Sequence, residues 1–177
     1  VGDQKVVILA AVFEESNFVA VQCQGNYTVN WGDGTVTNYS SNTIAYYQYD
    51  WNYSGFSGTT TSRGYKQTII TITPQAGQNL TLVRLNIKHN QTNLTSAYTN
   101  PWLDIKMSGS LISTLTIGTT TAADPLPRLL EQFDWIGSNN LTNVNNMFNG
   151  ANVLKQVKNL NTSTSTNFTS FFAQCYE

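Results

Sequence analysis

The chain has 177 residues, of which 40% are hydrophobic, 12% are aromatic and only 11% are charged. Its net charge of −1, with basic residues scattered along the sequence, argues against nucleic acid as a partner. No apolar run approaches the ~18–20 residues that cross a bilayer, so we expect no membrane span. Thr and aromatic residues are abundant while Ala, Glu, Lys and Arg are scarce, and we therefore predict a mainly β fold.

The first part of the chain has several short strand patterns separated by turn residues. The strongest is a hairpin in which Asp33-Gly34 divides two alternating segments. The expected strands are residues 6–12, 18–24, 27–31, 35–37, 44–51 and 64–74. Strands at this spacing favour a β-sandwich.

A short motif in this part carries a family resemblance. The motif is Trp31-Gly32-Asp33-Gly34, and it is followed by a Tyr-rich stretch and then by the Thr- and Ile-rich segment 64–72. This order resembles the signature of PKD-type immunoglobulin-like domains, although a long insert at 52–63 departs from it. The resemblance implies a PKD-like β-sandwich over residues 1–75 that serves as a spacer or binding module and not as an enzyme.

A short polar stretch at 75–78 is the expected domain boundary, and the pattern changes after it. Three irregular strand candidates follow, at 80–87, 102–109 and 111–118. We expect them to form an irregular cap over residues 79–126 of a second domain, which covers 76–177. Atypical terminal units are usual in repeat proteins.

The last part of the chain repeats itself from about residue 127. Residues 130–137 and 154–161 share one apolar pattern at an offset of 154 − 130 = 24, and the register continues from 144–148 to 168–172. Between the strands, residues 142–150 are expected to form one or two helical turns. A period of this length with apolar residues locked to it indicates stacked units that cover one another.

The repeated part resembles the BspA-like leucine-rich repeats, also called the surface-protein repeat of bacterial and phage proteins. The residues that carry the pattern are Met147, Phe148, Leu154, Phe171, Phe172 and Cys175, with Phe171 in place of its Met and Ala151 in place of its Cys in the earlier unit. The resemblance implies a solenoid of short strands and short helical turns. We expect the last unit to be incomplete, so that an apolar edge is left for further chain or for a neighbouring subunit.

Catalytic and metal chemistry find little support in the sequence. His89 is the only histidine, and we interpret it as a solvated loop residue. Asp33 is interpreted as the acceptor of a local turn and not as a cation ligand. The two cysteines, Cys23 and Cys175, are expected to be free thiols that are mostly buried. We expect no catalytic residues, no metal site and no cofactor, and hence no enzyme.

The aromatic-rich strand is the one candidate binding surface. Its residues are Tyr46, Tyr47, Tyr49, Trp51 and Tyr53. Aromatic rings exposed on a strand can anchor a glycan or a protein, whereas rings on the other face would be core. Both interpretations are open at this point.

The order of the two domains resembles structural proteins of marine tailed phages, in particular cyanophages. That resemblance implies a non-enzymatic protein of the virion surface, such as a capsid-decoration protein or a tail or fibre component that adheres to the host. Its partners would be other virion or surface proteins, a second copy or a host glycan. The alternatives are a bacterial cell-surface adhesin and a carbohydrate-binding accessory module of a larger enzyme.

Overall fold

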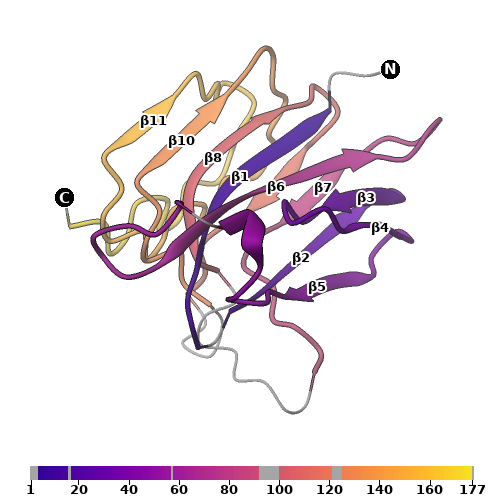
Figure 1. The fold of residues 1–177 in the computed structure, drawn as a ribbon. Helices are drawn as coiled ribbons and strands as arrows, with labels where there is room; N and C mark the ends of the chain where they lie inside the picture. Colours follow the sequence, from indigo (N-terminus) through magenta and orange to yellow (C-terminus); the bar gives the residue numbers. More distant parts are fainter. Residues whose placement is uncertain (1–3, 16, 57, 92–99, 121–124, 177) are drawn as a thin grey trace.

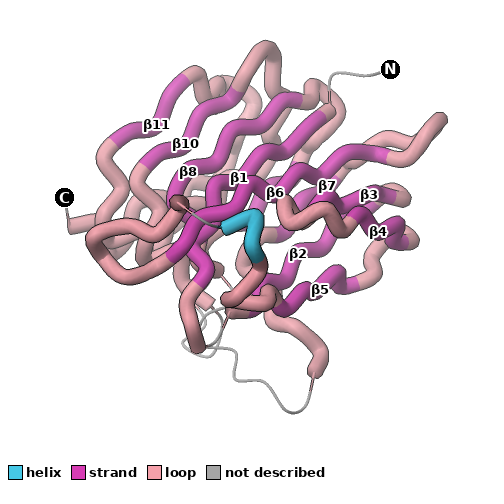
Figure 2. The backbone as a smooth tube through the Cα atoms, in the orientation of Figure 1, coloured by secondary structure: helices cyan, strands magenta, loops and turns pink. Residues whose placement is uncertain are grey.

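The structure, a computed structural model, describes residues 4–15, 17–56, 58–91, 100–120 and 125–176. Within these ranges the chain forms eleven strands and one short 3-10 helix, η1 (Ser54–Phe56), which is visible among strands and loops in Figure 2. The strands are β1 (Lys5–Val12), β2 (Phe18–Gln24), β3 (Tyr27–Asn30), β4 (Val36–Tyr39), β5 (Ile44–Gln48), β6 (Lys66–Pro74), β7 (Leu82–Arg84), β8 (Trp102–Ser108), β9 (Thr114–Thr116), β10 (Gln132–Trp135) and β11 (Gln156–Lys158).

The prediction of a mainly β fold is confirmed, and each expected strand position contains a strand. The strands form two sheets (Figure 1). The larger sheet has the order β11-β10-β8-β1-β6-β3-β4, and the smaller one has the order β5-β2-β7-β9. Both sheets are mixed, because β8, β10 and β11 run parallel to one another, as do β7 and β9.

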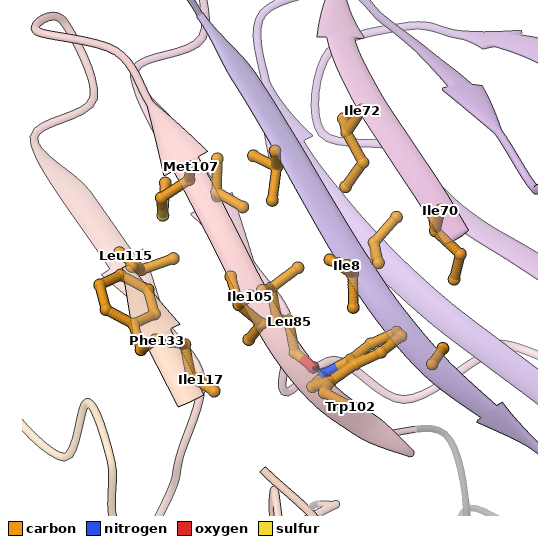
Figure 3. Close-up of a cluster of buried hydrophobic side chains, with 14 of the residues drawn as sticks. Ile8, Ile70, Ile72, Leu85, Trp102, Ile105, Met107, Leu115, Ile117 and Phe133 are labelled. Carbon is orange, nitrogen blue, oxygen red and sulfur yellow. Dashed lines mark hydrogen bonds between the residues drawn. The ribbon is translucent and has the colours of Figure 1, made fainter. Parts of the chain in front are cut away.

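The core lies between the two sheets, and period-two alternation directs side chains into it. In β6, Ile70 and Ile72 are buried while Ile69 points outward. Trp102 at the start of β8 is also buried, and its indole N–H donates to the Leu85 carbonyl at 2.9 Å. Figure 3 shows Ile70, Ile72 and Trp102 in one buried cluster. Burial of such apolar surface is the main favourable term in folding.

Both sheets contain strands from both sides of the boundary expected at residue 75. In the larger sheet, β1 pairs with β6 on one side and with β8 on the other. The side-chain amide of Gln4 donates to the Leu80 carbonyl at 2.7 Å and accepts from the Leu80 N–H at 2.8 Å. The division into domains 1–75 and 76–177 stays a prediction, because continuous pairing does not say how many folding units the chain has.

The structure does not show a separate solenoid in the described residues. The irregular cap expected at 79–126 instead divides between the sheets, since β7 and β9 join the smaller sheet and β8 joins the larger. Residues 92–99 and 121–124 of that expected cap lie outside the described residues. Strand propensity and apolar spacing do not specify which sheet a short strand joins.

The repeat offset is nevertheless present in the pairing of the last two strands. Gln132 lies opposite Gln156 and Phe133 opposite Val157, in parallel register at an offset of 156 − 132 = 24. The segment in which helical turns were expected, 142–150, forms successive hydrogen-bonded turns and no regular helix, with the N–H groups of Met147 and Asn149 donating to the carbonyls three residues earlier at 3.2 and 3.1 Å. Asn143 Oδ1 accepts from the Asn145 N–H at 2.9 Å, as an N-cap does, and Gly150 with φ 80° ends the turns.

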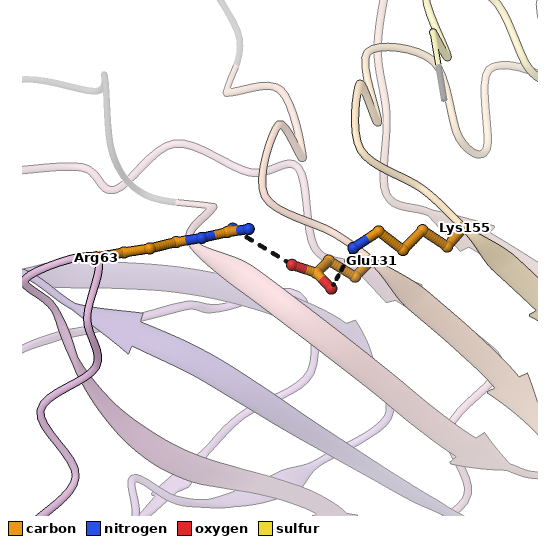
Figure 4. Close-up of polar contacts among 3 residues, drawn as sticks. All are labelled: Arg63, Glu131 and Lys155. Atoms are coloured by element: carbon orange, nitrogen blue, oxygen red, sulfur yellow. Dashed lines mark hydrogen bonds and ion pairs between the residues drawn. The ribbon is translucent and has the colours of Figure 1, made fainter.

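An ion-pair network joins the loop before β6 to the two parallel strands. Glu131 accepts from Arg63 at 3.4 Å and from Lys155 at 3.1 Å (Figure 4). Arg63 and Lys155 are both largely exposed. Such pairs contribute about 0.2–1 kcal/mol each, so they help to fix geometry more than they stabilise the fold.

The substitution Ile105→Ala is expected to destabilise the whole protein by about 2–5 kcal/mol, because it leaves a cavity where β8 faces the core. Urea unfolding followed by tryptophan fluorescence measures the loss. Leu111→Ala, at a side chain that is 54% exposed, is the matched control and should change stability by less than about 0.5 kcal/mol. Two separate transitions, of which only one shifts, would instead indicate independent folding units.

Candidate functional site

The aromatic residues of β5 and its continuation are mostly packed against the protein. Tyr49 is buried, and its hydroxyl donates to the Trp31 carbonyl at 2.9 Å. The Tyr47 ring stacks on the buried Trp31 ring with centroids 5.1 Å apart and an interplanar angle of 12°. These two tyrosines therefore hold the hairpin against the core and are not a free binding face.

The remaining three residues of the predicted aromatic surface differ in exposure. Tyr46 and Trp51 are half-buried, and the Lys66 ammonium lies 4.3 Å from the centroid of the Trp51 ring. Tyr53 is 37% exposed and packs edge-on against Phe56 at 5.2 Å. The structure thus does not bring the five predicted residues together as one exposed surface.

The Trp31-Gly32-Asp33-Gly34 motif forms the tight turn that the sequence predicts. Asp33 Oδ1 accepts from the Thr35 N–H at 3.0 Å, and Oδ2 accepts from the Tyr47 hydroxyl at 2.6 Å. Gly32 has φ 88°, and a Cβ there would lie 2.5 Å from the Ile69 carbonyl oxygen. The turn interpretation of Asp33 is confirmed, because each carboxylate oxygen has a partner within the protein.

The single histidine is not the solvated loop residue expected from the sequence. His89 is 9% exposed, and its ring meets Phe18 edge-on at a centroid distance of 4.9 Å. Its Nδ1 accepts from the Gln91 N–H at 3.1 Å, which leaves the proton of the neutral ring on Nε2. The prediction was wrong because the polar neighbours of His89 do not reveal that its segment packs on β2.

The thiols and the acidic groups that the structure describes show no metal-binding arrangement. Both cysteines are free, with Cys23 buried and Cys175 partly buried, as expected. The Cys175 thiol donates to the Phe148 carbonyl at 3.2 Å. Among the described residues no group of three or more His, Cys, Asp or Glu side chains could hold a metal ion. No helix in the same ranges is long and apolar enough to cross a membrane.

The outer end of the parallel strands is the most distinctive surface of the second half. Met147, Phe148 and Leu154 are buried, as the repeat predicts. Phe172 is 51% exposed and stacks on Phe148 at 5.5 Å with an interplanar angle of 10°. Phe171 is half-buried and meets the edge of Phe148 at 5.4 Å. A groove of about 530 Å³ opens here, lined by Val157, Asn159, Leu160, Asn161, Thr162, Phe171 and Phe172.

Two turn segments lie at this end, an inner one at residues 145–150 and an outer one at residues 169–174. Backbone hydrogen bonds at alternate residues join them. The N–H groups of Asn146, Phe148 and Gly150 donate to carbonyls of the outer segment, at 2.9, 3.0 and 2.9 Å. The acceptors are Thr169, Phe171 and Ala173. The inner segment is therefore covered by the corresponding segment of the next repeat unit.

The outer segment has the same backbone conformation as the inner one. Positive φ angles occur at Asn146 (56°) and Gly150 (80°), and again 24 residues later at Ser170 (170 − 146, φ 53°) and Gln174 (174 − 150, φ 59°). The Asx turn of Asn143 likewise recurs at Asn167, whose Oδ1 accepts from the Thr169 N–H at 3.0 Å. The outer segment thus presents the geometry that the inner segment uses for binding.

Two further grooves lie on the faces of the sheets. One, of about 500 Å³, is lined by Ile44, Arg84, Asn86, Ile87, Lys88, His89 and Thr116. The other, of about 610 Å³, lies on the outer face of the larger sheet and is lined by Leu9, Asn30, Gly32, Gly34, Gly55, Phe56, Thr59, Gln67, Thr68, Ile69 and Thr71. Most of these residues were not predicted from the sequence. The sequence signal for this groove was the pair Ile69-Ile70, because successive side chains of a strand point to opposite faces and one of the two isoleucines must point outward.

Comparison of the chain with protein-family models, with curated proteins and with solved structures gives no match.

Two tyrosines and a thiol predict a loss of stability at alkaline pH. Burial raises the pKa of Tyr49 well above its ordinary value of 10.0, and burial with the hydrogen bond to Asp33 raises the pKa of Tyr47. Burial also raises the pKa of Cys23 from 9.0 to about 12. Because the folded state keeps these protons longer than the unfolded state, stability is full below about pH 9 and falls as pH rises above it.

The substitution Tyr49→Phe tests this linkage. At pH 7 it should cost about 1 kcal/mol, because the hydrogen bond to the Trp31 carbonyl is lost. Above pH 10 the fall in unfolding free energy with pH should be shallower than in the wild type, as measured by urea unfolding at a series of pH values. Identical alkaline slopes in the two proteins would contradict the assignment.

Proposed function

We propose that the protein is a non-enzymatic structural and adhesive component of an extracellular or virion surface, and that it assembles through the outer end of its parallel strands. A capsid-decoration or tail and fibre role in a tailed phage agrees best with the order of the motifs. The chain reads as a PKD-like sandwich that leads into a BspA-type repeat array, with residues 154–176 as the last unit in this sequence.

The observation that carries this proposal is the repeated geometry of the outer segment. Within the described residues, the N–H groups of Ser170, Phe172 and Gln174 donate no hydrogen bond to the protein. Their counterparts 24 residues earlier all do. Apolar side chains surround these groups, with Phe168 47% exposed and Tyr176 77% exposed. Unpaired backbone groups beside exposed aromatic rings are typical of surfaces that bind a further strand.

The partner that fits the outer segment is a turn segment of the same backbone conformation on another surface protein. It must present carbonyl groups at alternate residues and an apolar ring over Phe172, as residues 169–173 do for the inner segment. A second copy cannot continue the array head to tail, because β8 at the inner end of its stack is already paired with β1. Aromatic anchors at the centre of such a contact carry most of the binding free energy.

Binding of a peptide with the sequence of residues 154–176 tests the surface. The inner segment is covered by this sequence, so the outer one should bind it in the same way, as measured by isothermal titration calorimetry. Phe172→Asp should weaken binding by about tenfold or more, because a charge replaces the stacked ring. The control Leu111→Asp changes a side chain that is 54% exposed in the turn before β9, and it should bind as the wild type does.

Peptide binding that is absent, or that is the same in Phe172→Asp, would contradict the proposed surface. Wild-type self-association in sedimentation velocity that Phe172→Asp abolishes would identify a second copy as the partner instead. Immunogold labelling of the source cells and particles tests the wider role. A cytosolic location would contradict it.

A further inference from the structure

The groove on the outer face of the larger sheet has an apolar floor, and Leu9 on this floor also packs against a small apolar cluster of Ala11, Tyr65 and Leu103. Leu9 on β1 and Ile69 on β6 are paired residues of neighbouring strands, so their side chains lie next to each other. Ile69 is 56% exposed, although the adjacent Ile70 is fully buried. Grooves that bind small ligands commonly combine apolar lining side chains with a few polar groups that fix the orientation of the ligand.

Neutral hydrogen-bonding groups surround this floor. Asn30 on β3 lies opposite Thr71 on β6, and Gln67 and Thr71 lie two residues on either side of Ile69. Asn30 Oδ1 accepts from the Gly32 N–H at 2.9 Å. Within the described residues, Asn30 Nδ2, the Gln67 side-chain amide and the Thr71 hydroxyl have no hydrogen-bond partner. They are therefore available to a ligand as both donors and acceptors.

Two loops form the walls of the groove, and both loops have glycine residues in its lining. The hairpin turn contributes Gly32 and Gly34, and the loop that contains η1 contributes Gly55. Figure 1 shows η1 lying in front of β6. A Cβ at Gly55 would overlap the Tyr53 ring, so the absence of a side chain lets that half-exposed ring lie along the loop beside the groove.

The charge of the lining limits the ligand class. None of the eleven lining residues is Asp, Glu, Lys, Arg or His. A charged ligand would lose hydration here without gaining a counter-charge, which is costly. A peptide strand would need an open sheet edge, whereas β6 is paired on both sides. The fitting ligand is small, uncharged, rich in hydroxyl groups and apolar on one face.

We propose that this groove binds a neutral saccharide. The C–H face of one pyranose ring packs on Ile69 and Leu9, and its hydroxyl groups bond to Asn30, Gln67 and Thr71. The volume of about 610 Å³ accommodates one or two sugar rings. This site adds a ligand class to the adhesive role proposed above. The saccharide site does not depend on the proposed peptide-binding surface, which follows β11 at the opposite edge of the sheet.

The test is a ¹H–¹⁵N NMR titration of the whole protein with the neutral disaccharides lactose, maltose, cellobiose and N,N′-diacetylchitobiose, with glycerol as the control for weak hydroxyl contacts. At least one disaccharide should shift the backbone signals of Gln67, Ile69 and Thr71. Glycerol should leave them in place.

Two variants locate the binding. Ile69→Asp places an unpaired carboxylate on the floor and should weaken binding by about tenfold or more. Its matched control is Ile136→Asp, because Ile136 is also 56% exposed but lies after β10, away from the groove. Gln67→Leu keeps the shape of the side chain and should weaken binding by about threefold to tenfold.

The outcomes separate the two proposals. Binding that survives in Ile69→Asp, shifts that glycerol reproduces, or no shifts with any of the four disaccharides would each overturn the saccharide site. None of these results would change the conclusion on peptide binding at the outer segment. Conversely, a failure of the Phe172→Asp experiment would leave the saccharide titration unaffected.

Discussion

Strand β8 joins the antiparallel part of the larger sheet to its parallel part, and the rest of the fold depends on this. One of its edges pairs antiparallel with β1 and the other pairs parallel with β10. Ile105 and Met107 on the same strand face the core between the sheets. Removing β8 would leave β10 and β11 without a template and would expose the centre of the antiparallel part. In the pairing that the structure shows, β8 therefore joins the antiparallel part of the larger sheet to the repeated strands β10 and β11.

The strands were predictable because they follow simple periodicity. Ile70 and Ile72 alternate with Ile69 and Thr71, and turn residues bound each segment. Their assignment to sheets was not predictable from the same signal. β7, β8 and β9 look alike as apolar steps, yet β8 joins one sheet and its two neighbours join the other. That choice depends on which long-range partner leaves fewer backbone groups unpaired, and a single sequence does not encode it locally.

The candidate surfaces show the same division between local and long-range information. The turn role of Asp33 depends on residues within a few positions of it, and it was predicted correctly. The fate of the aromatic strand depends on what packs over it, and Tyr49 is core while Tyr53 is half-exposed. The sheet groove combines residues from β1, β3, β6 and two loops, so no short window of sequence contains it. The 24-residue repeat is the exception, because a repeated sequence implies a repeated interface.

The unequal lengths of the strand ladders determine how the molecule would carry tension. β1 pairs with β6 over seven residues, whereas β10 pairs with β11 over three. Bonds at an edge strand that is pulled sideways break in succession, while those of long central strands pulled along their length share the load. A pull applied at the C-terminal edge would peel away β11 and then β10 before the ladders of β1 bear the full force. An attachment made at that edge would therefore yield in small steps and dissipate work while the core stays folded.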